Sequence, residues 1–230
     1  DGSLLIRPLS SFTDVLMHPL VKKHIPVLGE AVEQIGGPQI RNIGTIGGNI
    51  CNGVTSADSA GTLKAYDAIL EMASLEGTRV VPFKDFNIKP GKVNLLPGEI
   101  LTGIRIPKES YENTYGHFIK YAMRKAMDIA TLSCSVNVKL SKDKKKIERL
   151  RIAFGVAAPI PIRSLTAENG AAGHLLNEEL LNTIAEGVLQ DVMPRTSWRA
   201  SKEFRLHLVE ELARRATVES IEKAGGKLDD

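Results

Sequence analysis

Cysteine is scarce in this chain of 230 residues, which contains only Cys51 and Cys134. Two cysteines cannot build a framework of several disulfides, and they cannot supply the four thiolates of an iron–sulfur cluster or a zinc site. The five histidines are scattered along the chain, and none stands at metal-ligand spacing from another. No serine, histidine and aspartate arrangement of the hydrolytic type can be read from the sequence either. We therefore expect no metal site in this chain, and these patterns assign no catalytic residue.

An excess of one charge and long apolar runs are also lacking. The formal net charge is +3, from 30 basic and 27 acidic residues, and the one dense basic run is at 142–146. That excess is too small to indicate a nucleic-acid-binding surface. No apolar run approaches the roughly 18 residues of a membrane-spanning helix, and no secretion signal is seen. We expect a cytoplasmic protein without nucleic-acid or membrane partners. Because the chain opens with Asp1 and not methionine, we also expect the natural polypeptide to begin earlier.

The order of periodic segments predicts an α+β fold. In the first part, apolar spacing predicts a helix over 20–35, a capped helix over 59–68, a hairpin of strands at 69–73 and 78–82, and a strand at 99–106. In the second part, strand patterns at 117–124, 130–140 and 147–155 precede helical patterns at 166–172, 177–190 and 199–224. Strands followed by helices, without regular alternation, are typical of α+β proteins.

The segment 39–53 stands out, because four glycines and three asparagines fall within it. Glycine permits a positive φ and has no Cβ to keep a ligand away from the backbone. Successive N–H groups can then converge on an anion such as a phosphate. The alternative is a tight, ordered turn that binds nothing, and a glycine motif alone does not decide between the two.

Polar residues after this segment also allow two interpretations. Asp58 stands before a predicted helix, so it can cap that helix or accept hydrogen bonds from sugar hydroxyls, as carboxylates do in nucleotide sites. Lys120 and Arg124 are four residues apart on a predicted strand and would share a face. They are either an exposed edge pair or cations directed at an electron-rich ring or a phosphate.

The segment 40–51, with the sequence IRNIGTIGGNIC, resembles the R-N-x-[AG]-T-x-G-G-N-[IL] signature of the FAD-binding subunits of molybdenum hydroxylases. Further segments agree in order and spacing, and the resemblance covers nearly the whole chain, closest to the bacterial xanthine dehydrogenase branch. These segments are 56–58 (SAD), 90–92 (PGK), 98–101 (GEIL), 118–120 (FIK), Arg124 with 128–130 (DIA), 155–159 (GVAAP) and 199–205 (RASKEFR).

The resemblance implies two domains. Residues 1–107 would be the second part of a PCMH-type FAD-binding domain, and residues 108–230 a small C-terminal α+β domain like that of CO dehydrogenase flavoproteins. Family members begin with a further unit that carries a glycine-rich loop of the L-A-G-G-T type. That unit is not in this sequence, so we expect the chain to lack the N-terminal subdomain and to bind FAD less readily by itself.

Residue roles are also implied by the resemblance. The segment 44–49 would be the second FAD phosphate loop, Asp58 would bind a sugar or ribityl hydroxyl, and Lys120 would place a cation near the flavin. Ile35 falls where some relatives carry an aromatic residue near the adenine, and Met127 where some carry an acid near the flavin. The FAD-binding positions expected are Gly44, Thr45, Ile46, Gly47, Gly48, Asn49, Asp58, Ile100, Leu101 and Lys120.

The implied function is electron transfer through FAD. In the family, a heterocycle such as a purine is oxidised at a molybdopterin centre on one partner subunit, and electrons pass through 2Fe–2S clusters on another. We expect this chain to deliver those electrons from FAD to NAD, as an oxidoreductase subunit of a heteromeric complex in purine catabolism. Two alternatives stay open: the same fold with an acceptor other than NAD, and a scaffold that no longer binds FAD alone.

Overall fold

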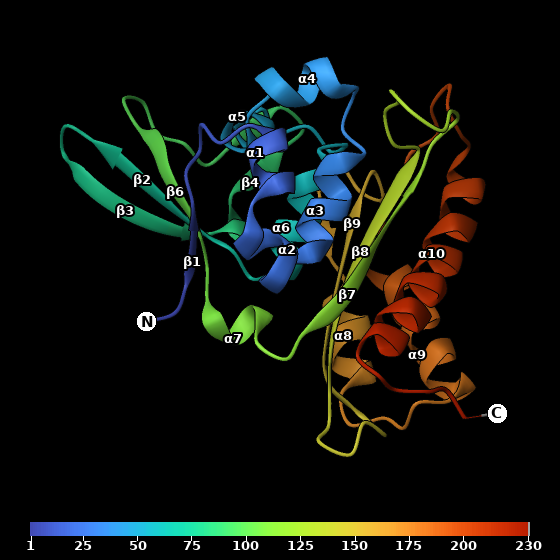
Figure 1. The fold of residues 1–230 in the computed structure, drawn as a ribbon. Helices are drawn as coiled ribbons and strands as arrows, with labels where there is room; N and C mark the ends of the chain where they lie inside the picture. Colours follow the sequence, from blue (N-terminus) through green and yellow to red (C-terminus); the bar gives the residue numbers. More distant parts are fainter. Residues whose placement is uncertain (230) are drawn as a thin grey trace.

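The computed structural model describes residues 1–229 and contains two four-stranded antiparallel sheets with helices between them (Figure 1). The first sheet has the strand order β1-β6-β2-β3. The hairpin predicted at 69–73 and 78–82 and the strand predicted at 99–106 are confirmed. The strands of this sheet are β1 (Leu4–Ile6), β2 (Ile69–Ser74), β3 (Gly77–Pro82) and β6 (Ile100–Ile106). Between β3 and β6 the chain forms the short helix η1 (Phe83–Asp85) and the strand pair β4 (Asn87–Lys89) and β5 (Lys92–Val93).

Short helices lie between the two sheets and along one edge of the molecule. They are α1 (Phe12–Met17), α2 (Pro19–His24), α3 (Pro26–Glu33), α4 (Pro38–Ile43), α5 (Ile46–Cys51) and α6 (Asp58–Ala65). The single helix predicted over 20–35 is wrong, because the chain forms α2 and α3 with Ile25 between them. Pro26 lacks the N–H that a continuous helix would need at this point, and it occupies the first turn of α3, where that N–H is not required.

Helix α6 is buried on all sides, since every residue from Asp58 to Ala65 is buried. It packs against α3 on one side and against the second sheet on the other. Gly61 faces β9, where a Cβ would be in ordinary van der Waals contact with the carbonyl carbon of Phe154, at 3.8 Å. Asn137 Nδ2 also donates to the carbonyl oxygen of Ala65 at 3.2 Å. This helix therefore joins the two hydrophobic cores of the molecule.

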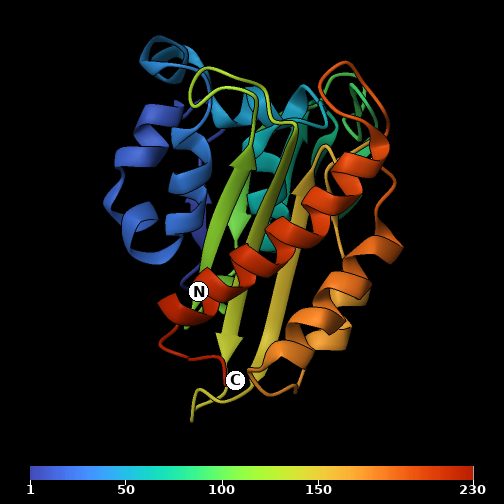
Figure 2. The same ribbon diagram turned by 90° about the vertical axis from the view of Figure 1, so that its right-hand side faces the viewer.

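The second sheet has the strand order β10-β9-β8-β7. Its long strands confirm the three predicted for this part of the chain, and the basic run 142–146 forms the turn between β8 and β9. The elements are α7 (Lys108–Tyr111), β7 (Tyr115–Tyr121), β8 (Leu132–Leu140), β9 (Ile147–Gly155), β10 (Ile162–Arg163), α8 (Leu165–Ala171), α9 (Glu178–Asp191) and α10 (Lys202–Lys223). Helices α3 and α6 cover one face of this sheet, and α10 crosses the other face diagonally (Figure 2).

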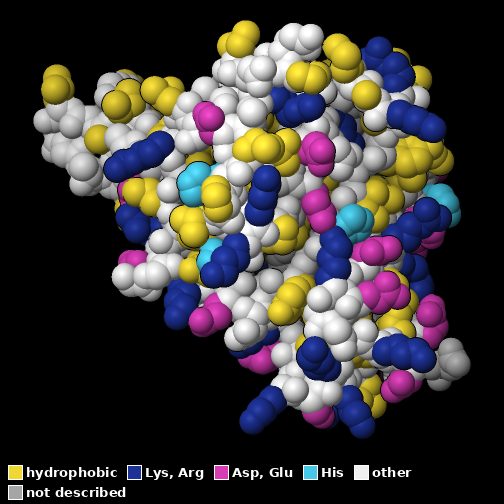
Figure 3. Space-filling model, viewed as in Figure 1, with side chains coloured by type: hydrophobic (Ala, Val, Ile, Leu, Met, Phe, Trp, Pro, Cys, Tyr) yellow, Lys and Arg dark blue, Asp and Glu magenta, His cyan; other side chains and the backbone are white. Residues whose placement is uncertain are grey.

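The surface agrees with the small net charge. Basic, acidic and hydrophobic side chains are interspersed over the face shown in Figure 3. Among residues 1–229, no helix combines the length and the apolar character that crossing a membrane requires.

Candidate functional site

Two adjoining pockets lie where α3, α5, α6 and the end of β7 meet. They share Gly36, Lys120, Met127 and Asp128 as lining residues. The smaller pocket has a volume of about 190 Å³. It is lined by Ile35, Gly36, Asn49, Ser56, Asp58, Lys120, Met127, Asp128 and Ile129. The structure thus brings Asn49, Asp58 and Lys120 together, as the sequence analysis expected, although 62 positions separate the last two.

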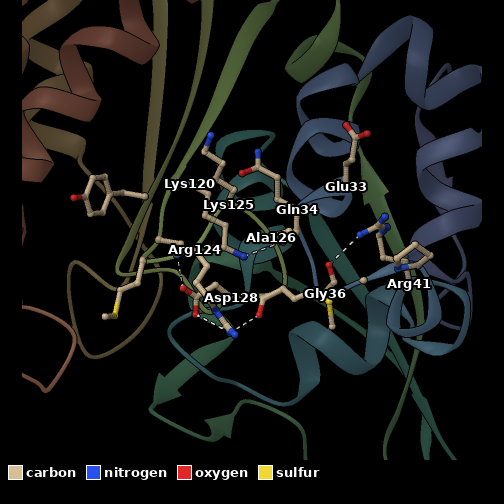
Figure 4. Close-up of a pocket in the computed structure, with 15 residues that line it drawn as sticks. Glu33, Gln34, Gly36, Arg41, Lys120, Arg124, Lys125, Ala126 and Asp128 are labelled. Atoms are coloured by element: carbon tan, nitrogen blue, oxygen red, sulfur yellow. Dashed lines mark hydrogen bonds and ion pairs between the residues drawn. The ribbon is translucent and has the colours of Figure 1, made fainter.

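The larger pocket, of about 640 Å³, is richer in charge. Arg41, Lys120, Arg124 and Lys125 line it together with the acidic Glu33 and Asp128, as the close-up in Figure 4 shows. Its floor includes the loop that connects β7 to β8, which Thr131 N closes by donating to the carbonyl oxygen of Tyr121 at 2.8 Å. An anionic group in this pocket would be surrounded mainly by positive charge.

Asp58 and Lys120 form a buried ion pair between α6 and β7. Lys120 Nζ lies 2.7 Å from Asp58 Oδ2 and donates to the carbonyl oxygen of Gln34 at 2.9 Å. The side chains of Lys120 and Asp58 are 6% and 5% exposed. Ala57 is the N-cap of α6 and no side chain caps this helix, so the interpretation of Asp58 as the cap is wrong. Asp58 is instead the first residue of the helix, and its carboxylate is available to the pocket.

The second oxygen of Asp58 has no partner. Oδ1 is buried and accepts no hydrogen bond in the structure. Buried acceptors are almost always paired, because leaving one unpaired costs its solvation by water. Burial also raises the pKa of Asp58 to about 6, a rise that the neighbouring ammonium of Lys120 limits. A ligand hydroxyl that donated to Oδ1 would satisfy this atom and stabilise the ionised carboxylate.

The glycine-rich segment is not a loop with left-handed glycines. It forms α4 and α5, and of its glycines only Gly53 has a positive φ. Gly44 and Gly47 are required by packing inside the protein. A Cβ at Gly44 would lie 2.8 Å from Cε2 of Phe12, and a Cβ at Gly47 would lie 2.5 Å from Cβ of Pro8. Two of the expected cofactor-binding glycines therefore face the protein itself.

The backbone amides of 46–49 are satisfied within the chain, which corrects the expectation that they point at a phosphate. Each N–H donates to an acceptor of the chain at 2.9–3.1 Å. The acceptors are the carbonyl oxygens of Ser10, Pro8 and Thr45 and the side-chain hydroxyl of Thr45. Ile46 is also fully buried.

The Asn49 side chain is what this segment offers to the smaller pocket. Its Oδ1 accepts from Ser59 Oγ at 2.7 Å, which leaves the Nδ2 donor free for a ligand. Gly48 is exposed, and outside its chain neighbours and the backbone of α5 a Cβ built on it would meet Oγ1 of Thr45, at 3.0 Å.

Some expected residues lie elsewhere. Ile100 and Leu101 begin β6 in the first sheet, Ile100 is 65% exposed, and neither lines the two pockets. Arg124 does not share a strand with Lys120, because β7 ends at Tyr121. Its guanidinium instead donates to the carbonyl oxygen of Met127 at 2.6 Å, within its own loop.

Two further residues contribute to the site without having been predicted from the sequence. Arg41 belongs to the signature segment, yet its role as a cation in the larger pocket was not predicted. Gln34 contributes a backbone carbonyl, which no side-chain pattern could reveal. Ile35 and Met127, by contrast, do line the smaller pocket.

No group of three or more metal-ligating side chains is found among residues 1–229.

Comparisons with known proteins agree with this architecture. The family model described as the FAD binding domain in molybdopterin dehydrogenase matches residues 1–109, and the model of the CO dehydrogenase flavoprotein C-terminal domain matches residues 117–220. A xanthine dehydrogenase FAD-binding subunit of Escherichia coli O157:H7 is 49% identical over 228 residues, which cover 99% of this chain and 77% of that protein. The chain belongs to the FAD-binding subunits of molybdenum hydroxylases. The family resemblance and the fold class expected from sequence are thereby confirmed.

One further sequence relative and one solved structure resemble this FAD-binding subunit over most of its length. The glyceraldehyde dehydrogenase medium chain of Sulfolobus acidocaldarius is 32% identical over 212 residues, covering 92% of this chain and 73% of that protein. A carbon monoxide dehydrogenase structure from Hydrogenophaga pseudoflava superposes with a TM-score of 0.91 at 26% identity, covering 97% of this chain and 76% of that chain. The subunit thus spans about three quarters of the length of these relatives.

Proposed function

We propose that this chain is the electron-transfer subunit of a xanthine dehydrogenase-like complex and passes electrons from iron–sulfur clusters, through FAD, to NAD. Molybdopterin and the 2Fe–2S clusters belong to partner subunits in this proposal, and the complex works in the cytoplasm on a purine-type heterocycle. The 49% identity to a xanthine dehydrogenase FAD-binding subunit supports the choice of complex. The observation that carries the FAD site is the buried and unpaired Oδ1 of Asp58.

The smaller pocket fits the hydroxyl-bearing part of FAD. Asp58 Oδ1 is an acceptor without a donor, and Asn49 Nδ2 is a donor held in place by the bond between Ser59 and Asn49 Oδ1. Together they offer the complementary partners that a sugar or ribityl hydroxyl needs. FAD supplies the redox chemistry when bound, and these residues supply orientation and electrostatics.

Lys120 acts on the bound cofactor together with Asp58. Because their ion pair is 2.7 Å long and buried, the positive charge of Lys120 is largely balanced by the carboxylate. The pair therefore presents a dipole to the pocket. Protonation of Asp58 would leave the ammonium charge of Lys120 unbalanced, and that charge would then attract negative charge on the bound cofactor more strongly.

The diphosphate of FAD would lie in the larger pocket. The amides of 46–49 are already bonded, and Arg124 lies 3.5 Å from Asp128, so the positive charges of Arg41 and Lys125 are the ones left to balance it. The segment 44–49 then contributes the Asn49 side chain and the open surface at Gly48. Contacts of Ile100 and Leu101 with the flavin ring stay predictions, because both residues lie on the first sheet.

Binding of FAD is tested with the purified chain itself. The chain should retain or take up FAD in close to equimolar amount, measured by its visible absorption after gel filtration. A protein that stays colourless after incubation with excess FAD, while its circular dichroism shows a folded chain, would support the scaffold alternative.

The acceptor is tested separately. The FAD-loaded chain is reduced anaerobically by titration with one equivalent of dithionite, which supplies the two electrons, and is then mixed in a stopped-flow instrument with NAD⁺ or with a quinone. Rapid return of the oxidised flavin absorption with NAD⁺ supports the proposal. Rapid return with the quinone alone would show that the chain uses an acceptor other than NAD.

A further inference from the structure

A second charged pocket lies at the opposite end of α6. Asp58 begins this helix in the pocket described above, whereas Lys64 lies near its end, about 9 Å further along the helix axis at 1.5 Å per residue. The second pocket has a volume of about 550 Å³ and lies where α6, η1 and α7 meet β9 and β10. Its charged lining consists of five basic and two acidic residues. We name it the seam pocket, because its lining residues come from strands of both sheets and from the helices beside them.

Two of the basic residues in the seam pocket are paired with carboxylates. Arg151 Nε lies 3.0 Å from Asp67 Oδ2, and Arg163 Nη1 contacts the other oxygen of the same carboxylate. Arg163 also donates to Glu168, with Nε 2.8 Å from Oε1. These arginines form a closed network that holds β9, β10 and α8 together and leaves little charge uncompensated.

The other three basic residues have no carboxylate partner among residues 1–229. Lys64 Nζ donates to the carbonyl oxygens of Phe83 at 3.3 Å and Lys84 at 3.4 Å. Arg149 Nη2 donates to the carbonyl oxygen of Glu109 at 2.6 Å and to Thr114 Oγ1 at 3.2 Å. Lys84 is exposed and forms no ion pair in the described chain. Neutral oxygens orient two of these cations without neutralising them.

The electrostatics of the pocket favour an added negative charge. Lys64 is only 3% exposed, and its burial lowers its pKa to about 8; the carboxylate of Asp85 opposes this decrease, and the charge of Arg163 adds to it. Burial and the nearby charge of Arg151 also lower the pKa of Arg149, and they outweigh the opposing carboxylates of Asp67, Glu148 and Glu109. Both decreases show that positive charge is costly at this place. An anion in the seam pocket would offset that cost.

The lining also indicates which anion fits. The aromatic ring at the pocket is that of Phe83, which is 0% exposed and so offers no surface on which a nucleotide base could stack. Recognition must therefore rest on charge and hydrogen bonds. Lys64 and Lys84 approach from α6 and η1, whereas Arg149 approaches from β9. A ligand with two linked oxyanions would present one to each side, and guanidinium groups match phosphate oxygens well.

We propose that the seam pocket binds a small polyvalent oxyanion of the pyrophosphate class, bridging α6 and η1 to β9. Such a ligand would strengthen the contact between the two halves of the chain without touching the proposed FAD site. The proposal is independent of FAD binding, since the seam pocket shares no lining residue with either pocket of the proposed FAD site.

Isothermal titration calorimetry of the full chain with inorganic pyrophosphate, at constant ionic strength, tests this proposal. Lys84→Glu should weaken binding by about tenfold, because it reverses an exposed charge at the pocket. Lys84→Arg should bind as the wild type does. Lys142→Glu is the matched control, since it reverses an exposed lysine on the β8–β9 turn, and it should leave the affinity unchanged.

The possible contrary results are distinct. Equal weakening by Lys84→Glu and Lys142→Glu would mean non-specific attraction and would overturn the proposal. Loss of binding in Arg124→Gln with no change in Lys84→Glu would place the pyrophosphate in the larger pocket near Asp58. Absence of heat and of thermal stabilisation with millimolar pyrophosphate would mean that no such site exists.

Discussion

Replacing Asp58 by asparagine removes the negative charge at the proposed FAD site and keeps the size of the side chain nearly unchanged. Oδ1 of Asp58 is buried without a partner, and burial raises the pKa of this carboxyl to about 6. A hydroxyl that donates to Oδ1 prefers the ionised carboxylate, so the affinity for FAD should fall as the pH is lowered through about 6. A hydrogen bond to a charged group contributes about 1.5–3 kcal/mol, which corresponds to a loss of roughly 10- to 100-fold when the carboxylate is protonated.

The Asp58→Asn variant should bind FAD about tenfold more weakly than the wild type near neutral pH and should lose this pH dependence. Quenching of FAD fluorescence over the range from about pH 5 to about pH 8 measures the dissociation constants. Asp143→Asn, on the β8–β9 turn, is the control and should follow the wild-type curve. A wild-type affinity that does not vary with pH, or a variant that keeps the wild-type profile, would refute the role of Oδ1.

The same carboxyl makes a prediction for stability. Its pKa in the folded protein, about 6, lies above the ordinary value of 3.8, so the folded state holds the proton more tightly than the unfolded state. The contribution of Asp58 to the free energy of unfolding should therefore decrease as the pH rises from 3.8 to about 6. Urea unfolding should show this decrease as a difference between the wild type and Asp58→Asn. A constant difference across that range would contradict the assigned burial.

Two further predictions concern packing and an ion pair. Gly47→Ala should lower the free energy of unfolding by about 1–3 kcal/mol, because its Cβ would lie 2.5 Å from Pro8. Gly48→Ala should cost less, because its Cβ would crowd only the Thr45 hydroxyl, at 3.0 Å; urea denaturation of both variants checks this. Burial disfavours the ionised form of Glu30, but hydrogen bonds from His117 and other donors outweigh it and lower the Glu30 pKa. Glu30→Gln should therefore cost about 1 kcal/mol at neutral pH, and the gap to the wild type should close as the pH falls below the ordinary value of 4.5; a gap that persists in acid would be the contrary result.

Local patterns were sufficient for much of the fold. The strand predicted at 147–155 has the bounds observed for β9, and Asn177 caps α9 by accepting from Leu180 N at 3.0 Å. Such features depend on neighbours a few residues apart, so the sequence displays them directly. The helix predicted over 20–35 failed for an equally local reason, because Pro26 ends one helix and begins another.

The sequence by itself also determined the family, through the signature at 40–51 and the spacing of the segments behind it. Only the tertiary structure decided how those residues act. Asp58 and Lys120 meet across 62 positions, and their pairing depends on α6 packing between α3 and the second sheet. The amides of 46–49 are taken by acceptors that include Ser10 and Pro8, which no motif reveals. Buried polar atoms must find partners wherever the fold places them, so it is the packing that leaves Asp58 Oδ1 free for a ligand.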